Sequence, residues 1–159
     1  MSVATFDANE YERWVQTARD HLDVARHDAA GGFSSAAVLQ SEQAAQCALK
    51  ALLHGAGQAQ AARGHGLLSL ADACGHWAGL VVDEEERRIL GRLARDYLTT
   101  RYPDALPEGT PMAHYGEEDA ERAVIVASRV LERVASAWDS LLRAADDDET
   151  VAPPDGEVP

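Results

Sequence analysis

The segment Arg101-Tyr102-Pro103-Asp104 holds the residues best suited to bind a small anionic ligand. The guanidinium of Arg101 is a planar fork of N–H donors that matches a phosphate group. Tyr102 offers a ring on which a base can stack, and Pro103 fixes the backbone beside both residues. A structural alternative stays open, in which Arg101 pairs with Asp104 or Asp96 and the tyrosine packs against the rest of the fold.

Arginines before this segment could extend a track for phosphate groups, because Arg88, Arg92 and Arg95 recur at one-turn spacing. However, Glu84 and Asp96 each stand four residues from one of these arginines, the spacing at which opposite charges pair on a helix. The spacing therefore favours a ladder of solvent-exposed ion pairs over a phosphate track.

Two further candidates, Gln43 and Lys50, lie on the helix predicted over residues 33–54. They are two turns apart on the only polar strip along this helix. If this strip is covered, the amide and the ammonium must find partners, and a ligand or a carboxylate of the first helix would serve. If the strip is exposed to solvent, neither group needs one.

Metal and cofactor sites are not indicated by the sequence. His65, Cys74 and His76 have metal-binding chemistry, but no matching pair lies elsewhere, so zinc is not expected. The chain has no Gly-rich phosphate loop, no Gly-x-Ser-x-Gly and no Cys-x-x-Cys. We therefore expect no cofactor.

Helices are the elements that must position these candidates, because apolar residues recur at helical spacing and nowhere alternate as in a strand. We predict an all-α, up-and-down bundle of four long helices and one short helix, over residues 7–30, 33–54, 67–74, 83–100 and 117–143. The helix over 33–54 is apolar around roughly 240° of its circumference, which predicts a central position enclosed by the others.

Several residues mark the ends of these helices. Side chains that can cap a first turn are Asp7 with Glu10, Ser34 or Ser35, and Asp83 with Glu86. Gly75 is expected to end the short helix, and Pro103 to end the fourth helix near Thr100. The segment 103–116 is predicted to be a non-helical loop, and loops of this length are often functional.

Composition limits the class of protein. The 159 residues fit one domain, over residues 1–143, followed by a disordered acidic tail over 144–159. The net charge of −13 argues against general nucleic-acid binding, which needs accumulated positive charge. No membrane span and no signal peptide is recognisable, so we expect a cytoplasmic protein with two reduced cysteines.

Four sequence pieces together resemble the HEPN domain family (higher eukaryotes and prokaryotes nucleotide-binding). They are Tyr11-x-x-Trp14 with Ala18 and His21-Leu22, the run from Gln43 to Leu53, Gly64-His65-x-Leu67, and Asp96-Tyr97-x-x-x-Arg101-Tyr102-Pro103-Asp104. The resemblance implies an all-α bundle, commonly a homodimer. It also implies a partnership with a minimal nucleotidyltransferase, as in toxin–antitoxin or defence-like pairs, nucleotide binding, or RNA cleavage. One departure is Gln46, which stands where the family usually has glutamate.

The ribonuclease branch of the family carries an arginine followed after four to six residues by a histidine. Here Arg101 is followed by His114 only after twelve residues, and no other arginine has a histidine at the required spacing. If the protein is a metal-independent ribonuclease, these two residues are the catalytic candidates. Such cleavage needs a general acid and a general base near the 2′-oxygen and a cation for the phosphate, all held on rigid elements.

Three hypotheses follow. The first is a dimeric module that binds a nucleotide or regulates a nucleotidyltransferase, with the nucleotide-binding candidates Arg101, Tyr102, Asp96, Tyr97, Arg95, Gln43 and Lys50. The second is the endoribonuclease. The third is a purely structural interaction module, favoured by the acidic balance and by the apolar heptad seam of the last helix.

Overall fold

The chain is largely helical over residues 6–150, which are the residues that this computed structural model describes. In chain order the elements are α1 (Ala8–Ala30), α2 (Ser34–Gly55), α3 (Leu67–Ala78), α4 (Glu84–Thr99), the 3-10 turn η1 (Pro103–Ala105), α5 (Pro111–His114) and α6 (Glu117–Thr150). No strand occurs in the described part of the chain. The all-α prediction is confirmed, with α1, α2, α4 and α6 as its four long helices.

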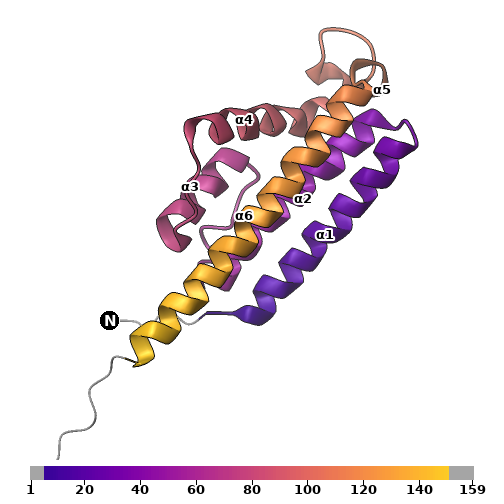
Figure 1. Cartoon of the computed structure of the whole chain (residues 1–159). Coiled ribbons are helices and arrows are strands. Elements are labelled where there is room, and N and C mark those ends of the chain that lie inside the picture. Colours follow the sequence, from indigo (N-terminus) through magenta and orange to yellow (C-terminus); the bar gives the residue numbers. More distant parts are fainter. Residues whose placement is uncertain (1–5, 151–159) are drawn as a thin grey trace, which may run out of the picture.

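The second helix, α2, is the centre of the bundle. It packs against α1 and α6 along its length and against α3 and α4 on another side (Figure 1). Its leucines Leu49, Leu52 and Leu53 are at most 1% exposed, and its alanines let the neighbouring helices approach closely. Burial of one leucine side chain stabilises a fold by about 1.5–3 kcal/mol, so the wide apolar arc of α2 forces this central position.

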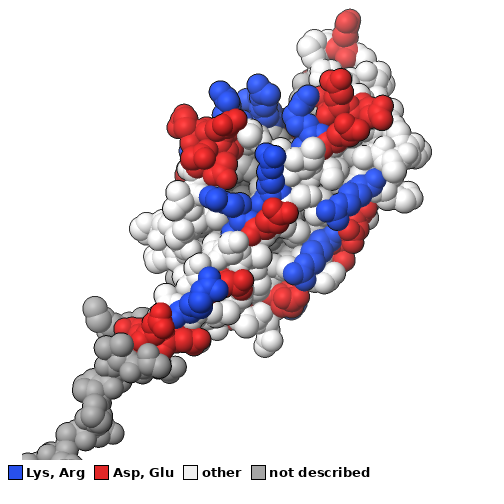
Figure 2. Space-filling model, viewed as in Figure 1, with Lys and Arg blue, Asp and Glu red and all other residues white. Residues whose placement is uncertain are grey.

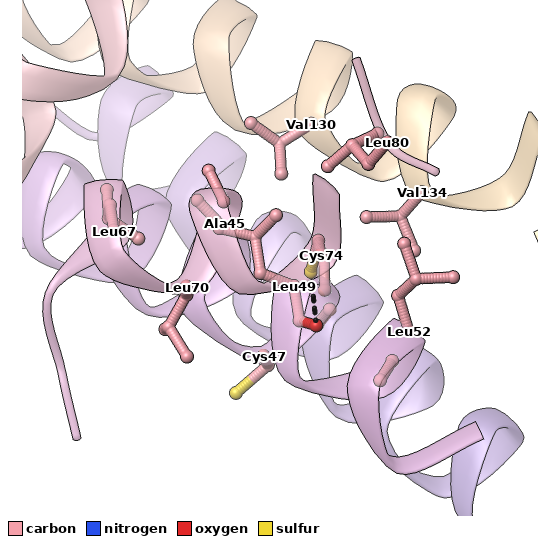
Figure 3. Close-up of a cluster of buried hydrophobic side chains, with 14 of the residues drawn as sticks. Ala45, Cys47, Leu49, Leu52, Leu67, Leu70, Cys74, Leu80, Val130 and Val134 are labelled. Atoms are coloured by element: carbon pink, nitrogen blue, oxygen red, sulfur yellow. Dashed lines mark hydrogen bonds between the residues drawn. The ribbon is translucent and has the colours of Figure 1, made fainter. Parts of the chain in front are cut away.

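A large part of the core lies where α2, α3 and α6 meet (Figure 3), and α1 and α4 add further buried side chains. Side chains from the three helices interlock there, among them Leu49, Leu52, Leu67, Leu70, Val130 and Val134. The thiol of Cys74 donates to the carbonyl of Leu49 at 3.3 Å, and burial raises the pKa of this thiol to about 12. Both cysteines are buried and unpaired, as expected.

Capping residues behave as predicted at two helix starts and differently at a third. Asp83 and Glu86 form a reciprocal capping box at α4, and Asp7 accepts the backbone N–H of Glu10 at α1. The expected serine cap of α2 is wrong, because α2 already begins at Ser34 and its N-cap is Phe33, which has no side-chain oxygen.

The third helix runs past the predicted stop at Gly75 and ends at Ala78, where the following Gly79 caps it with a left-handed φ of 67°. A Cβ at Gly75 would lie 3.2 Å from the carbonyl oxygen of Leu80. The missing side chain of Gly75 therefore lets the segment after α3 approach the helix closely, and this glycine does not end the helix.

The segment 103–116 contains the short helical elements η1 and α5, so the prediction of a wholly non-helical loop is wrong. Pro103 and Pro111 each start one of these elements, and Thr110 caps α5 by accepting the N–H of Ala113. Proline is tolerated at a first helical position because the N–H it lacks would be unpaired there.

The last helix continues through Ala144 to Thr150, so the expected disordered tail is wrong for residues 144–150; the remainder, 151–159, lies outside the described residues. The physical reason is that no Gly or Pro interrupts the chain between Gly116 and Pro153. The heptad seam of α6 packs within the domain, where Trp138 stacks on Tyr11 with ring centroids 4.2 Å apart. None of the helices described is long and apolar enough to span a membrane.

Candidate functional site

The end of α4 places Arg101 over the ring of Tyr97. The guanidinium carbon lies 4.2 Å from the ring centroid, and both side chains are half-buried. Within residues 6–150, the Arg101 side chain makes no hydrogen bond or ion pair. The proposed structural pairs with Asp104 and Asp96 are therefore not formed, and the five N–H donors of this guanidinium have no protein acceptor among the described residues.

The carboxylate of Asp96 is held elsewhere. It accepts the hydroxyl of Tyr115 at 2.7 Å, and the same hydroxyl is bonded to Thr99. Burial raises the pKa of Asp96, although the Tyr115 hydrogen bond opposes this shift. Asp96 thus serves to fasten the chain before α6 onto α4, rather than to pair with Arg101.

The imidazole of His65 lies against Tyr97 as well. The two rings stack with centroids 5.5 Å apart and an interplanar angle of 18°. His65 belongs to the segment between α2 and α3, and its Nδ1 lies 3.3 Å from the side-chain oxygen of Gln46. From the sequence, His65 was a residue of the Gly64-His65-x-Leu67 piece and a group with metal-binding chemistry, and it was not among the predicted nucleotide-binding residues.

A buried carboxylate, Glu42, lies beneath this cluster. It is 0% exposed, and its two oxygens accept amide N–H groups from Gln43 at 2.6 Å and from Gln46 at 2.7 Å. Burial raises the pKa of Glu42, while the two amides and the positive charge of Arg101 lower it. A glutamate on the apolar face of a helix is the sequence signal that could have found this carboxylate.

The remaining predicted residues are distributed around the molecule. Gln43 joins the cluster through Glu42, whereas Lys50 lies 5.8 Å from the ring of Trp14 on the α1 side of α2. Tyr102 is 52% exposed, and its ring stacks on no other ring of the described chain. The structure therefore brings Arg101 and Tyr97 into contact and bonds Gln43 to Glu42, whereas Lys50 lies on the α1 side of α2. Tyr102 follows Arg101 in the chain but points its ring at no other ring of the described residues.

Arginines of α4 line a different feature, a groove of about 720 Å³ between α4 and α6. Arg92 and Arg95 contribute from α4, facing Arg122 and Arg129 of α6. Figure 2 shows positive side chains on this face between two acidic groups, and the first turns of both α4 and α6 are acidic. The predicted ladder of ion pairs forms only in part, since Arg88 pairs with Glu85 at 3.9 Å rather than with Glu84.

The histidine of the ribonuclease hypothesis, His114, is exposed and packs edge-on against Tyr115 with ring centroids 5.1 Å apart. No hydrogen bond joins it to Arg101 in the described structure. The role of this pair in catalysis stays a prediction. Among the described residues, no three His, Cys, Asp or Glu side chains gather to hold a metal ion.

The cluster combines a cation without a protein acceptor among the described residues, an aromatic ring and an imidazole. A cation with free donors lies on an aromatic ring, next to an imidazole that is exposed to solvent. A guanidinium with free donors can bind a phosphate or a carboxylate through two parallel hydrogen bonds, and a base can stack on an aromatic ring.

Comparison with known proteins agrees with this fold. The sequence profile of the HEPN domain family matches residues 11–137. TT1696 from Thermus thermophilus is 32% identical with a TM-score of 0.75, over 81% of this chain and 98% of that chain. The archaeal HEPN homologue ST0689 is 30% identical with a TM-score of 0.65, over 80% and 97% of the two chains.

A third structure, the HEPN domain protein TM0613 from Thermotoga maritima, is 29% identical with a TM-score of 0.60, over 78% of this chain and 95% of that chain. No curated protein matches. Because the family profile spans most of the sequence and the structures share the same arrangement of helices, this chain belongs to the HEPN domain family.

Proposed function

We propose that this HEPN domain protein is a dimeric module that binds the phosphate of a nucleotide, or of a short RNA end, through Arg101. The observation that carries this proposal is the half-buried guanidinium of Arg101, which has no acceptor in the described structure. A cation that has lost part of its hydration without gaining a protein partner is ready to accept an anion.

The surroundings of Arg101 hold it in place without using its donors. Contact with the ring of Tyr97 fixes the plane of the guanidinium, which lowers the entropy lost when a ligand binds. The negative charge of Glu42 attracts Arg101, yet both carboxylate oxygens already accept amide hydrogens. The acid therefore stabilises the cation from a distance and leaves its N–H groups for a phosphate.

Thermal unfolding against a panel of nucleoside mono-, di- and triphosphates tests this proposal. A nucleotide at a hundred times its Kd should add about 2.7 kcal/mol of stability. Arg101→Ala should abolish this gain. Arg88→Ala is the matched control. The Arg88 side chain is 70% exposed, and its ion pair with Glu85 is 3.9 Å long and lies at the surface. A panel without any stabilising nucleotide, or a gain that survives in Arg101→Ala, would overturn the proposal.

A protein partner, either a second copy or a nucleotidyltransferase, is supported by apolar side chains exposed near the same end of α4. Leu98 and Tyr102 are each 52% exposed, and Met112 is 48% exposed. Light scattering at micromolar concentration should give twice the chain mass of 17.1 kDa. A monomer mass would refute the dimer, and a nucleotidyltransferase whose rate is unchanged by this protein would refute that partnership.

A further inference from the structure

Three polar side chains connect the buried centre of α2 to the surface beside Arg101. Glu42 accepts the amide N–H of Gln46 at 2.7 Å, and the amide oxygen of Gln46 lies 3.3 Å from Nδ1 of His65. Glu42 is fully buried and Gln46 is 3% exposed, whereas His65 is open to solvent. The connection therefore ends at a group that a ligand can touch.

The chemistry of the groups decides which of them donates and which accepts in each of these hydrogen bonds. An ionised carboxylate only accepts hydrogen bonds, and Glu42 accepts one amide N–H from Gln43 and one from Gln46. The Gln46 amide thus turns its nitrogen to Glu42 and its oxygen to His65. Because an amide oxygen only accepts, Nδ1 of His65 must carry the proton of the neutral imidazole, and Nε2 is left as an acceptor.

The imidazole of His65 and the guanidinium of Arg101 both contact the ring of Tyr97. The imidazole of His65 lies 5.5 Å from the ring of Tyr97, and the guanidinium of Arg101 lies 4.2 Å from the same ring. The two groups are therefore no farther apart than the sum of these distances. In a nucleotide a single sugar ring separates the phosphate from the hydroxyls, so one ligand can reach both groups.

We propose that His65 is a specificity-determining residue of this site, which selects ribonucleotides by accepting a hydrogen bond from a sugar hydroxyl while Arg101 binds the phosphate. Gln46 and Glu42 are positioning residues that keep Nε2 free as the acceptor. This inference rests on the nucleotide binding proposed above. A ligand without the hydroxyl loses one neutral hydrogen bond, which corresponds to a loss of about 2- to 10-fold in affinity.

Calorimetric titration of the full chain with nucleoside 5′-monophosphates and their 2′-deoxy and 3′-deoxy forms tests the selection. We expect the ribonucleotide to bind about 2- to 10-fold more tightly than one of the deoxy forms. His65→Ala should weaken ribonucleotide binding to the level of that deoxy form and leave the deoxy form unchanged. His65→Gln should keep part of the preference because an amide oxygen can also accept. His76→Ala, in an exposed histidine of α3, is the matched control.

Gln46→Ala tests whether Gln46 acts by positioning His65 or only by packing in the core. If it positions His65, the substitution should reduce the preference for the ribonucleotide, while the affinity for the deoxy form stays the same. A direct test without ligand is the nitrogen NMR spectrum of the imidazoles, with the His65 signals identified by their loss in His65→Gln. We expect a proton on Nδ1 of His65, and a proton on Nε2 instead would overturn the inference.

The outcomes distinguish this inference from the proposed function. Equal affinity for ribonucleotides and deoxynucleotides, with Arg101 still required, would refute the role of His65 and leave phosphate binding intact. Absence of binding to every form would refute both.

Discussion

Replacement of Gly55 by alanine tests the packing at the end of α2. A Cβ at this position would lie 2.7 Å from Cζ3 of Trp138 and 2.9 Å from Cβ of Tyr11. The two aromatic rings stack on each other in the core, so neither can move aside without losing that contact. Overpacking of this kind costs about 1–3 kcal/mol, whereas the better helix propensity of alanine returns at most about 1 kcal/mol. We therefore expect a net loss of stability.

Urea denaturation followed by tryptophan fluorescence measures this loss. Gly91→Ala is the matched control within α4, because the nearest atom to its added Cβ is Cδ1 of Leu68 at an ordinary 3.7 Å. That substitution should stabilise the protein by up to about 1 kcal/mol. In a Trp138→Phe background, which removes the crowding ring atoms, the cost of Gly55→Ala should shrink. The reasoning is refuted if Gly55→Ala is as stable as the parent.

Other substitutions test further parts of the fold in the same denaturation assay. Leu49→Ala should cost about 2–5 kcal/mol because the side chain is 1% exposed, and a cost below about 1 kcal/mol would mean that the core is looser than described. Asp83→Ala should cost about 0.5–2 kcal/mol through the lost capping box, and Asp104→Ala, without such a bond, should cost less. Burial raises the pKa of Glu42 above its ordinary 4.5, so this carboxyl contributes its stability below that pH and loses it as the pH rises through the folded pKa. The unfolding free energy of the parent minus that of Glu42→Gln should therefore fall with rising pH, and an increase would contradict the burial of this group.

Much of the fold could be predicted because local sequence and burial agree in this chain. The wide apolar arc of α2 can be satisfied only by enclosure, and the capping box of Asp83 and Glu86 marks a helix start without tertiary help. The errors at Gly75 and at the start of α2 have a shared cause. A glycine or a serine near a helix end has several roles, and neighbouring segments far away in the chain decide which role applies.

The candidate site was predictable only in part. Arg101 and Tyr97 lie four residues apart at the end of α4, so their contact follows from helical spacing. The approach of His65 to Tyr97 depends on the path of the chain between α2 and α3, which no periodicity describes. Glu42 was missed because apolar neighbours hide a single buried acid in any pattern of hydrophobicity, and only its amide partners explain its presence.

The position of the proposed site across α2 and α4 would link ligand binding to local opening of the fold. α4 buries only Leu90 and Leu93, far fewer side chains than α2, so it is expected to detach at a lower free energy than global unfolding requires. A ligand held by Arg101 after α4 and by His65 before α3 would resist this detachment. Amide hydrogen exchange in α4 would then slow on binding while exchange in α1 stayed the same. Any factor that releases α4 would then also release the ligand.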